Sequence, residues 1–552
     1  MTTASTAAAP PAGTVKPGHW SSHVYLDIGF TLLVTATVLV GLTFRDYGIT
    51  HDEAVQNEYG KMILSYYTSF FADQSCLEYL DLFRYGGFFD LLAAIANRFL
   101  TFGVYETRHL LGGLLGVIGL AGAWRCGRLL GGERAGIFAL LFLALTPSFY
   151  GHMFNNPKDA PFASAMIWAV LFLSHIALEF PSPRRRWVIG FGVALGIAIS
   201  IRAGAVLLIF YLGLAGLAYL IGLWRHRDFG AVLRDLWRML AALWPALPIA
   251  YVVMALFWPW AYQDWLNPIR ALQDFSHLSV NLESMVAGEV VKASQLPPYY
   301  LPVYLGVMLP EMILMGLVLA GLLGLVWLGR RKAGERLGTA PLPFLLVGLA
   351  ALFPVLFFVL ARPTAYNGIR HFLFVVPPMA VLAAVACDRV LTAAWEFRHY
   401  LGRLLGALLT AAMVAQGWIM AGLHPHQYVY FNRLAGGLKG AAGSYEMDYW
   451  SNSLIEAARE LADFVERENG DAPVTRSYKV AVCGHALSAY YYFPPYLVFT
   501  RKLAEADFMI LLTHTNCHRK FEGKQIISID RFGVALSVVR DRRNLPTKDV
   551  GR

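Results

Sequence analysis

Charged residues are scarce in this chain. Only 15% of its 552 residues are Asp, Glu, Lys or Arg, whereas 57% are hydrophobic. One water-soluble core cannot enclose so many apolar side chains, so the composition excludes an ordinary soluble protein and indicates a protein embedded in a lipid bilayer. The formal net charge of +9 does not point to nucleic acid as a partner, because Lys and Arg gather in short gaps between apolar runs, as they do in membrane proteins.

Cysteines and nucleotide-binding motifs are also few or absent. The five cysteines show no C-x-x-C spacing, so the pattern indicates neither a zinc site nor a redox pair. Cys483 and Cys517 fall in one region that we expect to be exported, and they could form a disulfide in an oxidising compartment. The chain lacks a Walker loop and a Rossmann glycine fingerprint, which agrees with a substrate that needs no nucleotide phosphate cradle.

Long apolar runs dominate the first three quarters of the sequence. The first run, residues 28–44, is followed by Arg45 and Asp46 without a small-residue cleavage site, so we interpret it as a retained span. A window of about 20 residues per crossing predicts further spans. They lie near residues 109–131, 135–151, 161–180, 187–201, 204–223, 239–260, 302–328, 341–361, 372–391 and 404–423. The sequence therefore predicts an α-helical polytopic membrane protein with about eleven transmembrane helices.

Basic residues alternate between the two sides of these spans. The short loops within 125–134, 184–186, 225–238, 330–336 and 389–403 are rich in Lys and Arg, whereas the opposite short loops hold only Lys158, Arg202, Arg362 and Arg370. Because the rich side is cytoplasmic in membrane proteins, we expect the N-terminus inside and, with an odd number of spans, the C-terminus outside. This parity requires that Arg202 mark a turn between two short spans.

The sequence divides into three regions. We expect a disordered cytoplasmic N-terminus over residues 1–25, a transmembrane domain over 26–423, and a small extracytoplasmic α/β domain over 424–552. The external loop 45–108 has apolar and aromatic residues at helical spacing over 55–71 and an apolar stretch over 88–100 that is too short to span, which predicts two helices lying along the membrane interface. In the third region, Ser453 and Glu456 predict a capping box that opens a helix over 454–468. Strands are predicted at 479–483, 507–513, 525–529 and 534–539.

Acidic residues mark two of the external loops. Asp52 and Glu53 stand shortly after the first span, and Asp159 follows Lys158 at the mouths of the third and fourth spans. Two acidic loops that face one aqueous mouth could form a single site. The alternative for the first loop is structural, since Thr50-x-x-Glu53 fits a capping box and acids stabilise a helix N-terminus.

Cationic residues are predicted at the same level. Arg202 lies between two spans, and Arg370 with His371 opens the tenth span. Ionisable residues at or within spans are costly to place and are functional candidates, although each of these could instead snorkel to the interface. Together they form a cationic rim close to the acidic loops, which suits a phosphate held at the membrane surface.

This arrangement resembles the GT-C glycosyltransferases that use polyprenyl- or dolichyl-phosphate sugars, especially the protein O-mannosyltransferases and the lipid A aminoarabinose transferases. The resemblance extends over roughly residues 25–425 and depends on His51-Asp52-Glu53-Ala54 followed by Tyr59-Gly60, on the acid of the second loop, on Arg202, and on Arg370-His371-Phe372 ahead of Pro377-Pro378. Residues 424–432 and 445–450 also resemble a junction of bacterial members. The chain lacks lumenal β-trefoil repeats and its second loop reads Asn-Pro-Lys-Asp, which leaves the acceptor open.

The resemblance implies transfer of a hexose or pentose from a polyprenyl-phosphate donor to a hydroxyl of a lipid, glycan or protein acceptor, at the outer face of a bacterial inner membrane. Asp52 would be the catalytic base, with inversion at the anomeric carbon. The donor phosphate would be bound by Arg202, Arg370, Lys158 and His371. Glu53 and Asp159 would orient Asp52 or the acceptor, or would hold a divalent cation such as Mg²⁺ or Mn²⁺, as in a related oligosaccharide transferase.

Two functions from other classes remain compatible with the sequence. A transporter or flippase for a lipid-linked or anionic substrate would use the same acids and arginines as a binding site, with broken helices at Pro245, Pro248 or Pro354 as gates. Transporters usually show repeated halves and ionisable groups near the middle of the membrane, and neither is evident here. A non-catalytic assembly subunit would leave the clustered loop charges unexplained.

Overall fold

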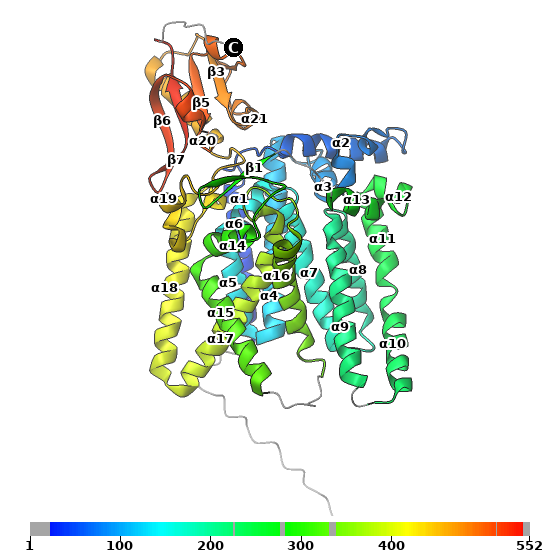
Figure 1. The fold of residues 1–552 in the computed structure, drawn as a ribbon. Coiled ribbons are helices and arrows are strands. Elements are labelled where there is room, and N and C mark those ends of the chain that lie inside the picture. The colour runs from blue at the N-terminus through cyan, green and yellow to red at the C-terminus, as the bar shows by residue number, and fades with distance from the viewer. Residues whose placement is uncertain (1–21, 225–226, 277–281, 331–337, 515, 545–552) are drawn as a thin grey trace, which may run out of the picture.

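The computed structural model describes residues 22–224, 227–276, 282–330, 338–514 and 516–544. The predicted N-terminal region 1–25 lies almost entirely outside the described residues. In the described chain, a bundle of long helices carries a small sheet domain at one end (Figure 1).

The bundle consists of helices that can cross a membrane. Nine described stretches are long and apolar enough to do so. They are α1 (Ser22–Thr43), α4 (Val104–Gly131), α7 (Asp159–Leu178), η3 (Ala203–Val206) with α9 (Leu207–Trp224), α10 (Phe229–Leu243) with α11 (Ala246–Phe257), α15 (Glu311–Arg330), α16 (Leu342–Ala361), η4 (Arg370–Val375) with α17 (Val376–Phe397), and α18 (His399–Leu423). A bent pair, α5 (Glu133–Ala144) and α6 (Pro147–Asn155), counts as a tenth span if both parts form one crossing.

Among the described residues, nine or ten helical stretches meet this length and composition criterion, and α8 is the one predicted span that does not. The expected span at 187–201 is α8 (Arg185–Ile199), whose 15 residues fall short of the length that the other spans reach. A helix of this length rises about 22 Å, less than the roughly 30 Å hydrocarbon core. Hydropathy identified the segment correctly, but it could not show how early the helix ends. α8 nevertheless packs against the spanning helices α7 and α11 within the bundle, and the predicted orientation requires α8 to cross together with the residues that flank it.

Short elements gather at the end of the bundle that carries the sheet domain. The two short stretches of the first loop are indeed helical, as α2 (Glu53–Thr68) and α3 (Phe88–Ala96), and α2 lies across the bundle end (Figure 1). The same end holds α12 (Pro259–Gln263), α13 (Asn267–Ser276), α14 (Tyr300–Met308) and the hairpin of β1 (Glu283–Val286) with β2 (Glu289–Lys292). The hairpin was not predicted from the sequence. The acidic loop residues thus lie on the same side as the C-terminal domain.

The C-terminal domain is an α/β unit, as predicted. Its sheet has the order β4 (Leu497–Phe499), β3 (Tyr478–Cys483), β5 (Phe508–Leu512), β7 (Val534–Asp541), β6 (Lys524–Arg531). β3 is parallel to β4 and β5, and β7 is antiparallel to β5 and β6. Every residue of the central β5 is buried, because the strand packs between α20 (Leu454–Asn469) on one face and a second apolar cluster on the other. The four predicted strands are confirmed, and β4 is additional.

The start of α20 differs from the prediction. Ser453 precedes the helix, but its hydroxyl donates to Asp448 (2.5 Å) and makes no capping bond to α20. Glu456 pairs with Arg531 and His426 instead of reaching back to Ser453. The predicted capping box is therefore wrong, because tertiary partners compete for both of its side chains.

The C-terminal domain contacts the first external loop directly. The Ser488 hydroxyl, on α21 (Leu487–Tyr490), donates to the Ile49 carbonyl, and the rings of His51 and His485 lie 4.6 Å apart. A disulfide joins Cys483 at the end of β3 to Cys517 on α22 (Cys517–Lys520), as the sequence allowed. These contacts fix one face of the domain beside the segment that leads into α2.

Candidate functional site

Asp52 lies where the first loop turns into α2. It is the residue immediately before the helix, and its carboxylate accepts a hydrogen bond of 2.8 Å from the Arg370 guanidinium. The Asp52 side chain is 38% exposed, whereas that of Arg370 is 6% exposed. Partial burial opposes ionisation of Asp52, but Arg370 and then Lys158 outweigh it, so the pKa of Asp52 falls below its usual value. Asp52 is thus an ionised carboxylate that remains accessible from outside.

Arg370 is held from three directions. Besides Asp52, its guanidinium lies against the rings of Tyr366 (4.7 Å) and Trp450 (4.9 Å). Planar guanidinium groups stack on aromatic faces and keep their charge. Trp450 belongs to the junction after the last span, so the junction helps to position a charge that η4 supplies. We did not predict this contact, although the junction itself was recognised in the sequence.

Asp159 and Arg202 form a second pair beside the first. Asp159 opens α7, is 3% exposed, and forms an ion pair with Arg202, which directly precedes η3. Asn156 supports the carboxylate, since its amide donates to Asp159 (3.0 Å) and its own oxygen accepts from the Asp159 backbone N–H (2.8 Å). Arg202 therefore does more than extend its charge to the membrane interface, because it has a specific acidic partner. Its acid partner is 43 positions away along the chain, which explains why the local sequence showed none.

Lys158 and His371 lie close to these pairs. The Lys158 amine is 3.9 Å from the centre of the Tyr85 ring, and burial, offset in part by Asp90, lowers the pKa of Lys158 to about 8. The His371 ring packs edge-on against Tyr366 at 4.6 Å. The two aspartates and the four predicted cationic residues are therefore brought together, from the first loop, the α6–α7 turn, the start of η3 and the start of η4.

Glu53 is the predicted residue that points elsewhere. Its carboxylate is 1% exposed and accepts from the Thr50 backbone N–H (2.8 Å), while its other oxygen lies 3.1 Å from the His109 ring. The structural interpretation of Thr50-x-x-Glu53 is thus correct in part, because the carboxylate binds the Thr50 backbone. Both Glu53 oxygens are used in holding the loop against α4, so Glu53 supports the position of Asp52 through the backbone.

Two buried groups near the site were missed. Asp90 of α3 forms an ion pair of 2.6 Å with Arg108 of α4, and both side chains are almost fully buried. Glu446, in the junction, accepts from the Ser284 hydroxyl (2.7 Å) and from the Gly368 backbone N–H (3.2 Å). Glu446 thereby ties the β1–β2 hairpin to the turn that carries Arg370. In the sequence, only its position in the acidic and aromatic stretch 445–450 indicated that Glu446 could matter.

A divalent cation does not fit this donor set. The carboxylates of Asp52 and Asp159 are each paired with a guanidinium, and Glu53 is committed to Thr50 and His109. In the part of the chain that the structure describes, no group of three or more His, Cys, Asp or Glu residues is arranged to hold a metal ion. Hard cations require several free oxygen ligands at one point, whereas here arginine side chains already pair with the Asp52 and Asp159 carboxylates.

Comparison with known proteins places the fold. Residues 93–262 match the family model described as dolichyl-phosphate-mannose-protein mannosyltransferase, a range that includes Lys158, Asp159 and Arg202. The apo crystal structure of the Archaeoglobus fulgidus oligosaccharyltransferase matches with a TM-score of 0.50 and 12% identity, over 85% of this chain and 65% of that one. This chain has a GT-C fold. The fold class predicted from the sequence is thus confirmed.

Two other GT-C structures are similar at lower TM-scores. One is ArnT from Cupriavidus metallidurans bound to undecaprenyl phosphate, at 17% identity and a TM-score of 0.44, covering 94% of this chain and 97% of that one. The other is the archaeal oligosaccharyltransferase AglB from Archaeoglobus fulgidus with an inhibitory peptide and a dolichol-phosphate, at 12% identity and 0.48, covering 88% and 69%. A search of curated protein sequences found no significant match.

Proposed function

We propose that this protein is a membrane glycosyltransferase that moves a sugar from a polyprenyl-phosphate carrier to a hydroxyl of a lipid, glycan or protein acceptor. The observation that carries the proposal is the cluster at the end of the bundle, where the accessible carboxylate of Asp52 lies among buried and half-buried cationic groups. Transfer of a sugar from a phosphate carrier needs a proton acceptor and fixed positive charge within one site. The GT-C fold and the family match at 93–262 support the same class.

In the proposed reaction, Asp52 accepts the proton of the acceptor hydroxyl as its oxygen attacks the anomeric carbon. The new carbon–oxygen bond forms on the face opposite the bond to phosphate, which breaks and leaves its electron pair on the polyprenyl phosphate. The configuration of the anomeric carbon inverts. Arg202, Lys158 and His371 surround the position at which the leaving phosphate gains charge, and Arg370 keeps Asp52 ionised. No metal ion takes part in this scheme.

We propose that the site faces the periplasmic side of a bacterial inner membrane, with the N-terminus in the cytoplasm. The basic loops support this orientation, because they lie between spans on the side opposite the Asp52 loop. The disulfide between Cys483 and Cys517 supports it independently, since disulfides persist in oxidising compartments.

The test is sugar transfer from a radiolabelled lipid-phosphate sugar pool, in membranes that contain matched amounts of wild type, Asp52→Asn or Arg202→Ala. Label should pass to acceptor in wild type and fall at least about a hundredfold in Asp52→Asn. Purified protein in liposomes is then tested for movement of the lipid-linked sugar between leaflets. Movement without transfer would replace the proposal with the transporter or flippase.

A further inference from the structure

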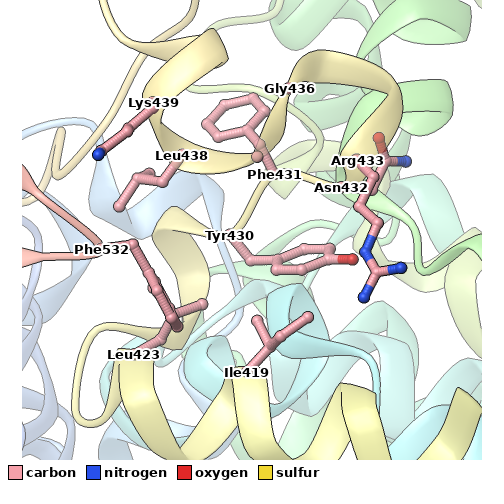
Figure 2. Close-up of a pocket in the computed structure, with 11 residues that line it drawn as sticks. Ile419, Leu423, Tyr430, Phe431, Asn432, Arg433, Gly436, Leu438, Lys439 and Phe532 are labelled. Atoms are coloured by element: carbon pink, nitrogen blue, oxygen red, sulfur yellow. The ribbon is translucent and has the colours of Figure 1, made fainter.

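A cavity lies away from the cluster of Asp52 and Arg370, between the last span and the C-terminal domain. Its volume is about 320 Å³, within the range of small-molecule sites. Its floor consists of Ile419 and Leu423 from the last turn of α18 together with Tyr430 and Phe532 (Figure 2). Phe532 comes from the turn between β6 and β7, so two domains build the cavity together.

The cavity lies at the level where α18 leaves the bilayer. α18 presents Trp418 (79% exposed) and Val414 (68% exposed) outward just before it ends at Leu423. Apolar side chains on the outside of a spanning helix face lipid tails, and tryptophan is common at the headgroup level. A lipid beside this helix therefore meets the apolar floor with its chains and the cavity rim with its headgroup.

The rim carries two cations. Arg433 and Lys439 lie on opposite sides of the floor, as Figure 2 shows. Among the described residues, neither side chain takes part in an ion pair. Glu311 accepts the backbone N–H of Arg433 (2.8 Å), and no Asp or Glu is among the described residues that line the cavity. The combination of an apolar floor and a cationic rim is complementary to a lipid phosphate.

We propose that this cavity binds an anionic phospholipid of the outer leaflet. Its phosphate lies between Arg433 and Lys439, and one acyl chain runs along Ile419 and Leu423. Because Phe532 closes directly over α18, where a Cβ on Gly422 would lie 2.8 Å from its ring, the bound lipid touches the C-terminal domain as well as the last span. The site is separate from the cluster of Asp52 and Arg370 and does not depend on the proposed reaction.

The same segment connects the lipid site with the cluster. Tyr430 lines the cavity, whereas Tyr428, two residues earlier, lies 5.7 Å from the His152 ring and 6.2 Å from that of Trp450, ring centre to ring centre. Trp450 in turn covers Arg370. Lipid that orders residues 428–433 is therefore expected to stabilise the junction that positions Arg370.

The test uses the full-length protein purified in a non-ionic detergent. Binding is measured by native mass spectrometry and by the rise in unfolding temperature, with phosphatidylglycerol, phosphatidylcholine or water-soluble glycerol phosphate. We expect phosphatidylglycerol to bind about tenfold or more tightly than phosphatidylcholine, and Arg433→Gln/Lys439→Gln to remove that preference, since each interfacial cation contributes to anionic-lipid binding. Arg362→Gln, which removes an exposed cation at the outer end of α16, should retain it.

Three results would overturn the proposal. They are equal binding of both lipids by wild type, an unchanged preference in the double variant, and loss of the preference in Arg362→Gln to the same degree. Binding of glycerol phosphate as tightly as phosphatidylglycerol would also overturn it, because the site would then be one for free anions. Both variants replace surface cations by neutral residues. Their unfolding temperatures are measured without lipid to verify that they fold.

Discussion

Replacement of Asp52 by Asn keeps the size of the side chain and removes its ability to accept a proton. A positioned general base contributes about 10²- to 10⁴-fold to a rate, which corresponds to about 2.7 to 5.4 kcal/mol of activation free energy. We expect kcat for sugar transfer to fall by that factor. The KM for the donor should change much less, because Arg202 and Lys158 still surround the proposed phosphate position.

The same substitution has a smaller effect on folding. The Asn oxygen can still accept the 2.8 Å hydrogen bond from Arg370, but the buried guanidinium loses its counter-charge. Breaking a fully buried pair costs about 3–5 kcal/mol. Because the Asp52 side chain is 38% exposed, water screens the loss, and we expect about 1–2 kcal/mol.

The assay compares initial rates of transfer in detergent for wild type, Asp52→Asn and Glu58→Gln, with the unfolding temperature of each. Glu58 lies on the same helix in an exposed pair with Lys61, so its variant controls for charge loss on α2. If Asp52→Asn retains more than about a third of the wild-type kcat while folded, the reasoning is refuted and Asp52 has only a structural role.

Four other predictions follow from groups around the site. Burial lowers the pKa of Lys158 to about 8, so Lys158 loses its charge above that pH. The kcat/KM for the donor should therefore decline above about pH 8, and Lys158→Arg should remove this decline from the pH profile. Burial raises the pKa of Glu446 to about 7, above its unfolded value, so folding favours the protonated form. The unfolding temperature of the wild type should therefore fall as the pH rises from about 5 to 7 and then level off. Glu446→Gln should flatten this pH dependence. Reduction of the disulfide, which spans 34 positions, should destabilise the C-terminal domain by about 4 kcal/mol in denaturant unfolding, and an unchanged midpoint would contradict this. Transfer activity should survive dialysis against EDTA within about twofold, and a loss that Mg²⁺ or Mn²⁺ restores would show that the carboxylates rearrange around a cation.

Hydropathy and loop charge predicted most of the fold because they act over short windows. Each span and four of the five C-terminal strands were visible as runs of apolar residues of suitable length. The β1–β2 hairpin was not predicted because its turn is Ala287-Gly288. Ala287 adopts a positive φ of 51°, which alanine rarely does. The usual Asn-Gly or Asp-Gly signal is absent there.

The site could be predicted as a set of residues but not as a set of pairs. The topology placed Asp52 and Arg370 on one side of the membrane, yet 318 positions separate them, and no periodicity links residues that far apart. The contacts of Glu53 could not be predicted for a related reason. Its neighbour in sequence is Asp52, but its partner in space is His109 on α4. Side-chain partners depend on packing between helices, which a single sequence does not encode locally.

The separation between partners also sets the order in which the site can be completed during biosynthesis. Asp159 and Arg202 are 43 positions apart, so their pair can form early, once two neighbouring spans have been inserted. The pair of Asp52 and Arg370 must await the start of η4, and the stacking of Trp450 on Arg370 awaits the junction that follows α18. A chain that ends before Arg370 therefore holds Asp52 without its guanidinium, and one that ends before Trp450 holds Arg370 without one of its two stacking rings.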